Sequence, residues 1–148
     1  MKFFRILLVI LWMLLIFFFS NKNSHNSTNQ SKNFIYTNIE VICRTFNIII
    51  EEEKLEYFVE TIELPIRKCA HVFLYCVLSI LVVSLLKSYN MSYKEIFICT
   101  FLFCLLYSIS DEIHQAFVPG RNGNIKDIFI DCIGIYTGIY ISIFLKNK

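Results

Sequence analysis

Two histidines and two carboxylates stand out in the sequence, because imidazole and carboxyl groups can act as general acids and bases or bind metal ions. His71 lies in a polar segment, and Asp111, Glu112 and His114 lie together further along the chain. The paired histidines of an HExxH metal motif are absent. We therefore predict that these four residues are acid–base groups, with a metal ion held by the His/Asp/Glu cluster as the alternative and no other cofactor.

Helical spacing brings further polar residues onto the same faces. Arg67, His71 and Tyr75 are four residues apart, and so are Asp127 and Asp131. An ionisable side chain inside a bilayer costs a few kcal/mol, so such stripes should face protein or a water-filled cavity. The residues predicted to bind a ligand beside the acid–base groups are Arg67, Lys68, Tyr75, Gln115, Arg121, Asp127 and Asp131.

Purely structural roles are the alternative for several of these residues. Asp131 would be the buried ion-pair partner of Arg67 or Arg121, and Asp127 would be a charge in the first turn of a helix capped by Asn124. The spacing Gly134-x-x-x-Gly138 is typical of close helix packing. Both interpretations place the polar stripe of this helix against a neighbouring helix.

The elements that must position these residues are four apolar stretches, at about 3–19, 69–86, 96–117 and 128–145. A helix needs about 20 apolar residues to cross a hydrocarbon layer of about 30 Å. The chain of 148 residues is 56% hydrophobic, 18% charged and has a mean hydropathy of +0.58. We predict one all-α membrane domain with four transmembrane helices in the lipid bilayer. The net charge of +2 does not indicate a nucleic-acid partner.

The segment 21–66 separates the first two spans and is expected to lie outside the membrane. Residues 21–33 are polar without periodicity, which predicts an irregular linker. Apolar residues then recur at steps of three and four over 35–49 and again over 55–62, which predicts two amphipathic helices. These helices would lie in the headgroup region or form a cap over the bundle.

Lysine and arginine near the ends of spans favour the cytoplasmic side. A model with both termini in the cytoplasm puts six basic residues there, which are Lys2, Arg5, Lys87, Lys94, Lys146 and Lys148. The polar stripes then reach the outer face.

Three motifs follow in order: Arg67-Lys68-x-Ala70-His71-x-x-x-Tyr75, then Ser110-Asp111-Glu112-x-His114-Gln115-x-Phe117-x-Pro119-Gly120-Arg121, then Asp127-x-x-x-Asp131-x-x-Gly134. Together they resemble the VanZ-like family over about residues 67–138. The resemblance implies a bacterial multi-pass protein of the cell membrane, named after an accessory of glycopeptide resistance that protects against teicoplanin. It assigns these residues as motif positions and implies no mechanism.

Three functions fit these observations. In the first, an outward-facing charged pocket within the membrane binds a cell-wall or lipid-linked ligand and affects glycopeptide susceptibility. In the second, a membrane-embedded hydrolase or transferase uses Glu112 or Asp111 as a base, with His71 or His114 as its proton partner. In the third, Asp131 and the histidines are relay groups of a proton-coupled transporter.

Overall fold

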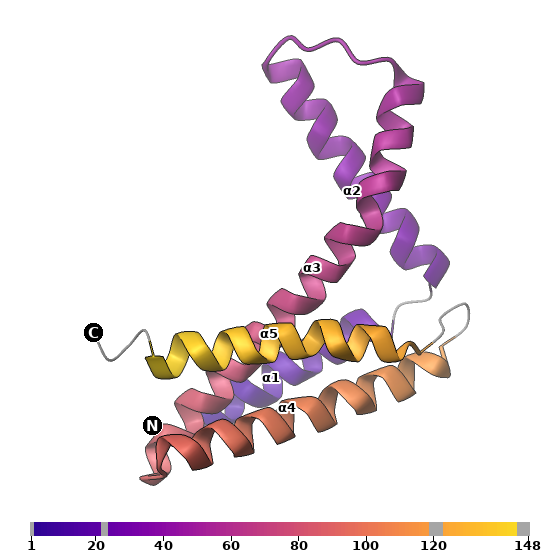
Figure 1. Ribbon diagram of the computed structural model, residues 1–148. Helices are drawn as coiled ribbons and strands as arrows, with labels where there is room; N and C mark the ends of the chain where they lie inside the picture. Colours follow the sequence, from indigo (N-terminus) through magenta and orange to yellow (C-terminus); the bar gives the residue numbers. More distant parts are fainter. Residues whose placement is uncertain (1, 22–23, 119–122, 145–148) are drawn as a thin grey trace.

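A computed structural model describes residues 2–21, 24–118 and 123–144 of the chain, with side chains for all of these except 24–30 and 144. Every regular element in this part of the chain is a helix (Figure 1). In chain order the elements are α1 (Lys2–Ser20), α2 (Ser24–Thr45), α3 (Glu52–Leu86), the short 3-10 helix η1 (Lys87–Tyr89), α4 (Tyr93–Ala116) and α5 (Ile125–Phe144).

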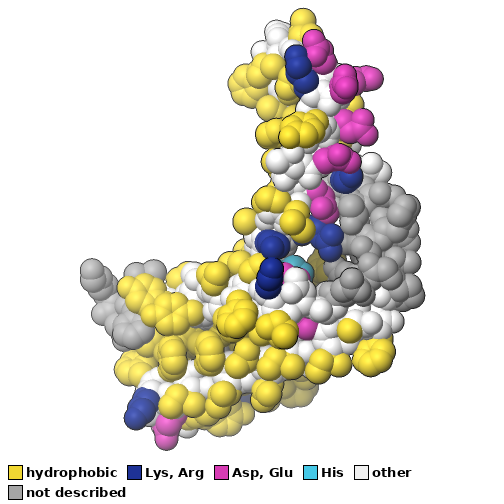
Figure 2. Space-filling model, turned by 45° about the vertical axis from the view of Figure 1, so that its right-hand side comes forward, with side chains coloured by type: hydrophobic (Ala, Val, Ile, Leu, Met, Phe, Trp, Pro, Cys, Tyr) yellow, Lys and Arg dark blue, Asp and Glu magenta, His cyan; other side chains and the backbone are white. Residues whose placement is uncertain are grey.

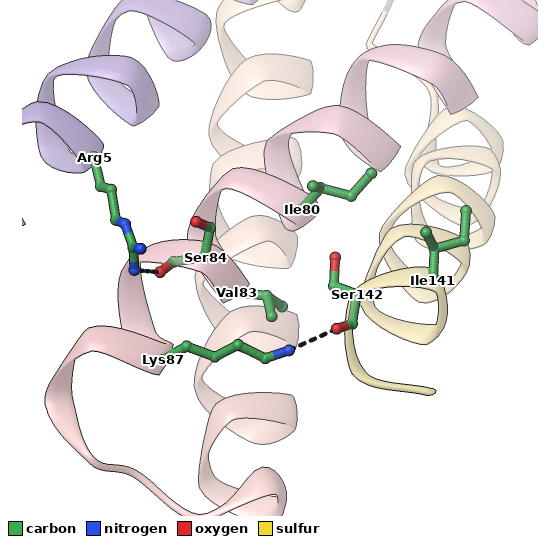
Figure 3. Close-up of a pocket in the computed structure, with 7 residues that line it drawn as sticks. All are labelled: Arg5, Ile80, Val83, Ser84, Lys87, Ile141 and Ser142. Atoms are coloured by element: carbon green, nitrogen blue, oxygen red, sulfur yellow. Dashed lines mark hydrogen bonds between the residues drawn. The ribbon is translucent and has the colours of Figure 1, made fainter. Parts of the chain in front are cut away.

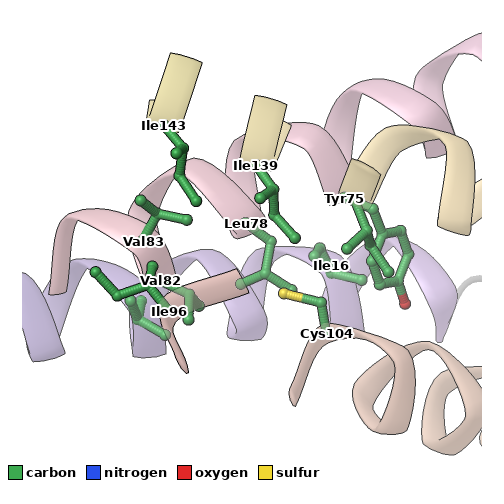
Figure 4. Close-up of a cluster of buried hydrophobic side chains, with 11 residues drawn as sticks. Ile16, Tyr75, Leu78, Val82, Val83, Ile96, Cys104, Ile139 and Ile143 are labelled. Atoms are coloured by element: carbon green, nitrogen blue, oxygen red, sulfur yellow. The ribbon is translucent and has the colours of Figure 1, made fainter. Parts of the chain in front are cut away.

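A four-helix bundle is formed by α1, the second half of α3, α4 and α5 (Figure 1). Its core holds aliphatic side chains from every one of these helices, for example Ile16, Leu78, Ile96 and Ile139, all at most 1% exposed (Figure 4). Hydrophobic side chains also cover the outside of the bundle (Figure 2). A surface of this kind suits acyl chains better than water.

Among the described residues, three helices are long and apolar enough to cross a membrane. These are α1, α3 together with η1, and α4. Helix α5 packs beside them but is not one of the three, and its first two turns carry Lys126, Asp127 and Asp131. The predicted all-helical, membrane-like fold is confirmed at this level.

Helix α5 lies closest to α3, and two glycines make this approach possible. A Cβ atom on Gly134 would overlap the backbone of Val72, and one on Gly138 would overlap Ser79 Oγ and the carbonyl of Cys76. The packing role predicted for the Gly134-x-x-x-Gly138 spacing is therefore confirmed.

An arm made of α2 and the first half of α3 stands off the bundle (Figure 1). Its two helices pack through Ile35, Leu55 and Val59. On its surface Lys32 Nζ donates a hydrogen bond of 2.6 Å to Glu60, which raises the pKa of Lys32. The two amphipathic stretches thus pack on each other.

Two details of this outer segment were predicted incorrectly. The polar residues 24–33 belong to α2 and do not form an irregular linker. The second amphipathic stretch is also not separate from the second span, because α3 is a single helix of 35 residues that passes through Pro65. Such a helix is about 52 Å long, so it exceeds a bilayer core of about 30 Å and its first half extends beyond the bundle.

The two ends of the bundle differ in their residues. The first turn of α1, the last turn of α5 and η1 all lie at one end of the bundle (Figure 1). There Lys87 Nζ donates a hydrogen bond of 2.7 Å to the carbonyl of Ser142, and Lys2 Nζ lies 4.4 Å from the ring centroid of Tyr89. At the opposite end Ser20 contacts Asp111. Of the six basic residues that the sequence groups together, Lys2, Arg5, Lys87 and Lys94 thus lie at the end away from Asp111, and Lys146 and Lys148 lie outside the described residues.

Candidate functional site

Asp131 joins three helices in the interior. Its side chain on α5 is 0% exposed, and Oδ2 accepts a hydrogen bond of 2.6 Å from Ser108 Oγ on α4. Its other oxygen, Oδ1, lies 3.4 Å from Nδ1 of His71 on α3, which is an ion-pair distance when the imidazole is protonated, without hydrogen-bond geometry. Among the described residues the basic group beside Asp131 is His71 and not Arg67, whereas Arg121, the other predicted partner, lies outside the described residues.

Asp111 makes a second buried contact, between α4 and α1. Its Oδ2 accepts a hydrogen bond of 2.7 Å from Ser20 Oγ and one of 2.8 Å from Gln115 Nε2. All three side chains are buried. Gln115, and not His114, therefore shares the inward face of α4 with Asp111 and Ser108.

Glu112 and His114 lie apart from these two clusters. Glu112 Oε2 accepts a hydrogen bond of 2.8 Å from the backbone N–H of Asn124, just before α5. Asn124 Oδ1 in turn accepts from the backbone N–H of Lys126, so the predicted N-cap is confirmed. The half-buried ring of His114 lies against Phe17 of α1, with ring centroids 4.6 Å apart. Glu112 thus fixes the start of α5 in addition to any chemical role.

A cavity of about 80 Å³ lies where the arm meets the bundle. It is lined by residues of α3, α4 and α5, namely Leu64, Arg67, Lys68, His71, Gln115, Asp127 and Ile130. Five of these seven are residues that the sequence predicts for the site. Figure 2 shows basic side chains, a histidine and an acidic side chain together at this junction. The basic pair and the histidine therefore share one small space.

The remaining predicted residues are placed as follows. Tyr75 is fully buried, and its ring centroid lies 6.4 Å from that of Tyr107. Arg121 lies outside the described residues, as do Pro119 and Gly120 of the second motif. In the part of the chain that the structure describes, no group of three or more His, Cys, Asp or Glu side chains is arranged to hold a metal ion.

Several buried polar atoms have no hydrogen-bond partner among the described residues. They include His71 Nδ1, Asp111 Oδ1, Glu112 Oε1 and Asp131 Oδ1. Buried polar atoms are normally paired, so each of these atoms calls for an explanation such as a water molecule, an ion or a functional role. The three carboxylate oxygens are able to accept a hydrogen bond from water or from a bound molecule.

Two residues of this region were missed from the sequence. Ser20 ends an apolar run and shows no periodicity, so its polarity was the only available signal. Glu63 is buried and lies 3.4 Å from Arg67 Nη1, an ion pair with the spacing i to i+4 along α3. That spacing was visible in the sequence and could have identified Glu63.

Comparison with known proteins places the chain in a family. A family model described as VanZ/LLP1 matches residues 4–146, which extends well beyond the three motifs. No curated protein and no solved structure matches the chain. Because the family model covers nearly the whole sequence, this helical, membrane-like protein belongs to the VanZ/LLP1 family.

Proposed function

We propose that this protein binds the phosphate-bearing headgroup of a lipid-linked ligand of the cell envelope, at the outer end of its bundle. The observation that carries the proposal is the cavity between α3, α4 and α5, which is lined by both Arg67 and Lys68 and by the apolar side chains of Leu64 and Ile130. Such a lining matches a ligand that is anionic at one point and apolar beside it.

The charges at the cavity favour an anion. Arg67 and Lys68 outweigh the single carboxylate of Asp127 among the lining residues. A guanidinium group binds phosphate through two parallel hydrogen bonds, and an ammonium group adds a point charge. Arg67 also contacts Glu63 of the same helix at 3.4 Å, and its five N–H donors allow it to bind more than one acceptor.

The size of the cavity indicates which part of the ligand it can hold. A volume of about 80 Å³ is several times the roughly 10–15 Å³ that a cavity needs to hold one water molecule. A phosphate group therefore fits such a space. In the proposed arrangement the sugar or peptide part of a lipid-linked precursor lies outside the cavity, and its lipid tail lies along the apolar surface of the bundle (Figure 2).

Binding of a polyprenyl phosphate tests this proposal. The full chain is placed in nanodiscs of phosphatidylcholine that contain the polyprenyl phosphate, and the retained probe is measured by native mass spectrometry. We expect the double variant Arg67→Gln/Lys68→Gln to bind the probe about a hundredfold more weakly or worse, because it removes two charge-assisted contacts of about 1.5–3 kcal/mol each.

A matched control is the double variant Arg44→Gln/Lys54→Gln, which removes one arginine and one lysine from the exposed surface of the arm. It should retain the probe like the wild-type chain. Equal losses in both double variants would refute a specific headgroup site.

A hydrolase or transferase is the second candidate function. The observation that favours it is the position of His71, which lines the cavity and has the Asp131 carboxylate behind it. An imidazole oriented by a carboxylate is a common acid–base arrangement. Release of inorganic phosphate from the probe in the same nanodiscs, lost in Asp131→Asn but not in Arg44→Gln, would select this alternative over binding alone.

Four membrane crossings with both termini in the cytoplasm complete the proposal. Helix α5 has 20 residues and so matches a bilayer core of about 30 Å, and the helices α1 and α5 begin and end at one end of the bundle. Susceptibility to lipophilic glycopeptides such as teicoplanin would then depend on Arg67 and Lys68, which face the outer side.

Cysteine labelling tests this topology. We expect a membrane-impermeant maleimide to label Lys54→Cys in intact cells and Lys94→Cys only after the cells are permeabilised, each compared with the unmodified chain. Lys54 is exposed on the arm and Lys94 is exposed at the opposite end, in the first turn of α4. The reverse pattern would mean that the protein has the opposite orientation, with the site on the cytoplasmic side. Equal labelling of the two variants in intact cells would exclude four crossings.

A further inference from the structure

A second and larger cavity, of about 450 Å³, lies at the other end of the bundle, between α1, α3 and α5 (Figure 3). None of the three motifs contributes to it. Its polar lining consists of Arg5, Lys87, Ser84 and Ser142, and its apolar lining consists of Ile80, Val83 and Ile141. Cavities of this volume commonly hold small organic ligands.

The two cations of this cavity come from different helices, Arg5 from α1 and Lys87 from η1. Arg5 of α1 donates a hydrogen bond to the carbonyl of Ser84, and Lys87 donates one to the carbonyl of Ser142 (Figure 3). A guanidinium has five N–H donors and an ammonium has three. Each side chain is thus held in place by one hydrogen bond and retains further donors for a ligand.

The electrostatic balance at this end remains positive. The helix C-termini of α3 and α5 contribute about −0.5 charge each, and the N-termini of α1 and α4 contribute about +0.5 each, so the helix dipoles largely cancel. The acidic residue of this end, Glu95, does not line the cavity, because it forms a capping box with Ser92. Arg5 and Lys87 therefore determine the charge of the cavity.

We propose that this cavity binds the anionic phosphodiester headgroup of a membrane phospholipid, with the phosphate between Arg5 and Lys87 and an acyl chain along Ile80 and Ile141. The cavity is several times larger than a phosphate ion needs. Its isoleucine and valine side chains form no hydrogen bond or ion pair with a soluble anion, but they can pack against an acyl chain. Anionic lipids are attracted to basic residues at the ends of membrane helices. This site is separate from the headgroup site proposed above and does not depend on it.

Lipid retention tests this second site. The full chain is placed in nanodiscs of phosphatidylcholine with or without phosphatidylglycerol, and the lipids that stay bound are counted by native mass spectrometry. We expect the wild-type chain to retain phosphatidylglycerol in preference to phosphatidylcholine, and Arg5→Gln/Lys87→Gln to lose about tenfold or more of this preference. The variant Arg5→Lys/Lys87→Arg, which keeps both charges, should retain the preference, and the thermal midpoint of each variant in phosphatidylcholine alone shows that it is folded.

The matched control is Lys2→Gln/Lys94→Gln, which removes two other cations from the same end without touching the cavity. It should retain phosphatidylglycerol like the wild-type chain. Equal loss in the control would mean that only the general charge of this end matters, and the proposal would be wrong. It would also be wrong if inorganic phosphate alone, added to phosphatidylcholine nanodiscs, raised the thermal midpoint in an Arg5- and Lys87-dependent way, because the ligand would then be a soluble anion.

Discussion

Gly138→Leu is expected to destabilise this protein more than any substitution on the outside of α5. Even one carbon atom at this position would overlap Ser79 Oγ and the backbone carbonyl of Cys76, and the backbone of α3 cannot move aside as a flexible side chain could. Overpacking typically costs about 1–3 kcal/mol, and a leucine forced against backbone should reach or exceed the top of that range. We expect a lower thermal midpoint and less folded chain, measured by size-exclusion chromatography in detergent after heating.

The matched control for this prediction is Thr137→Leu, because Thr137 is the exposed neighbour of Gly138 on α5. A leucine there gains lipid contact and should change the thermal midpoint little. Gly138→Ala should fall between the two. If Gly138→Leu and Thr137→Leu have the same thermal midpoint, the close approach of α5 to α3 is wrong.

Asp131→Ala is expected to have the second large effect. The substitution removes the carboxylate that joins α5 to Ser108 of α4 and to His71 of α3, in a position that is 0% exposed. Removing one partner of a buried pair typically costs about 3–5 kcal/mol, because the other partner loses its acceptor. We expect thermal unfolding in detergent to show a loss of this order.

Two further variants test whether the loss of stability is specific to the Asp131 carboxylate. Asp131→Asn keeps an oxygen that can accept from Ser108, so it should lose less stability than Asp131→Ala. Asp127→Ala removes a half-buried carboxylate in the first turn of the same helix and should cost about 1 kcal/mol or less. Similar losses for Asp127→Ala and Asp131→Ala would show that Asp131 has no special role inside the bundle.

The sequence predicted the inward faces of the helices well, because polar residues are costly in a membrane and their spacing is therefore informative. The stripe of His71, Tyr75 and Ser79 is turned inward on α3, with Tyr75 and Ser79 fully buried. On α5 the same rule identified Asp131 and the two packing glycines. Period and polarity were enough to find which side chains face the interior of the bundle.

The structure of the outer segment 21–66 was harder to predict, because local composition does not show how far a helix extends once it has formed. Once the apolar residues from Ile35 onward pack on α3, extending α2 toward its N-terminus adds one hydrogen bond per residue without a new nucleation step, so polar residues can join it. Pro65 likewise did not separate two helices, because a proline within a helix removes a single backbone donor and packing on both sides can maintain the helix.

The contact partners of individual side chains could not be predicted from the sequence either. Adjacent positions on a helix point in different directions, so the cluster Asp111, Glu112 and His114 is divided among three surroundings: Ser20 with Gln115, the backbone of Asn124, and the ring of Phe17. Spacing alone did not reveal that His71 would lie beside Asp131, because this contact depends on the relative height of α3 and α5.

A high-resolution structure of the full chain in phosphatidylcholine nanodiscs that contain polyprenyl phosphate tests the proposed headgroup site most directly. We expect the phosphate to lie between α3, α4 and α5, in contact with the Arg67 guanidinium and the Lys68 ammonium. A cavity without the phosphate, in nanodiscs shown to hold the probe, would contradict it.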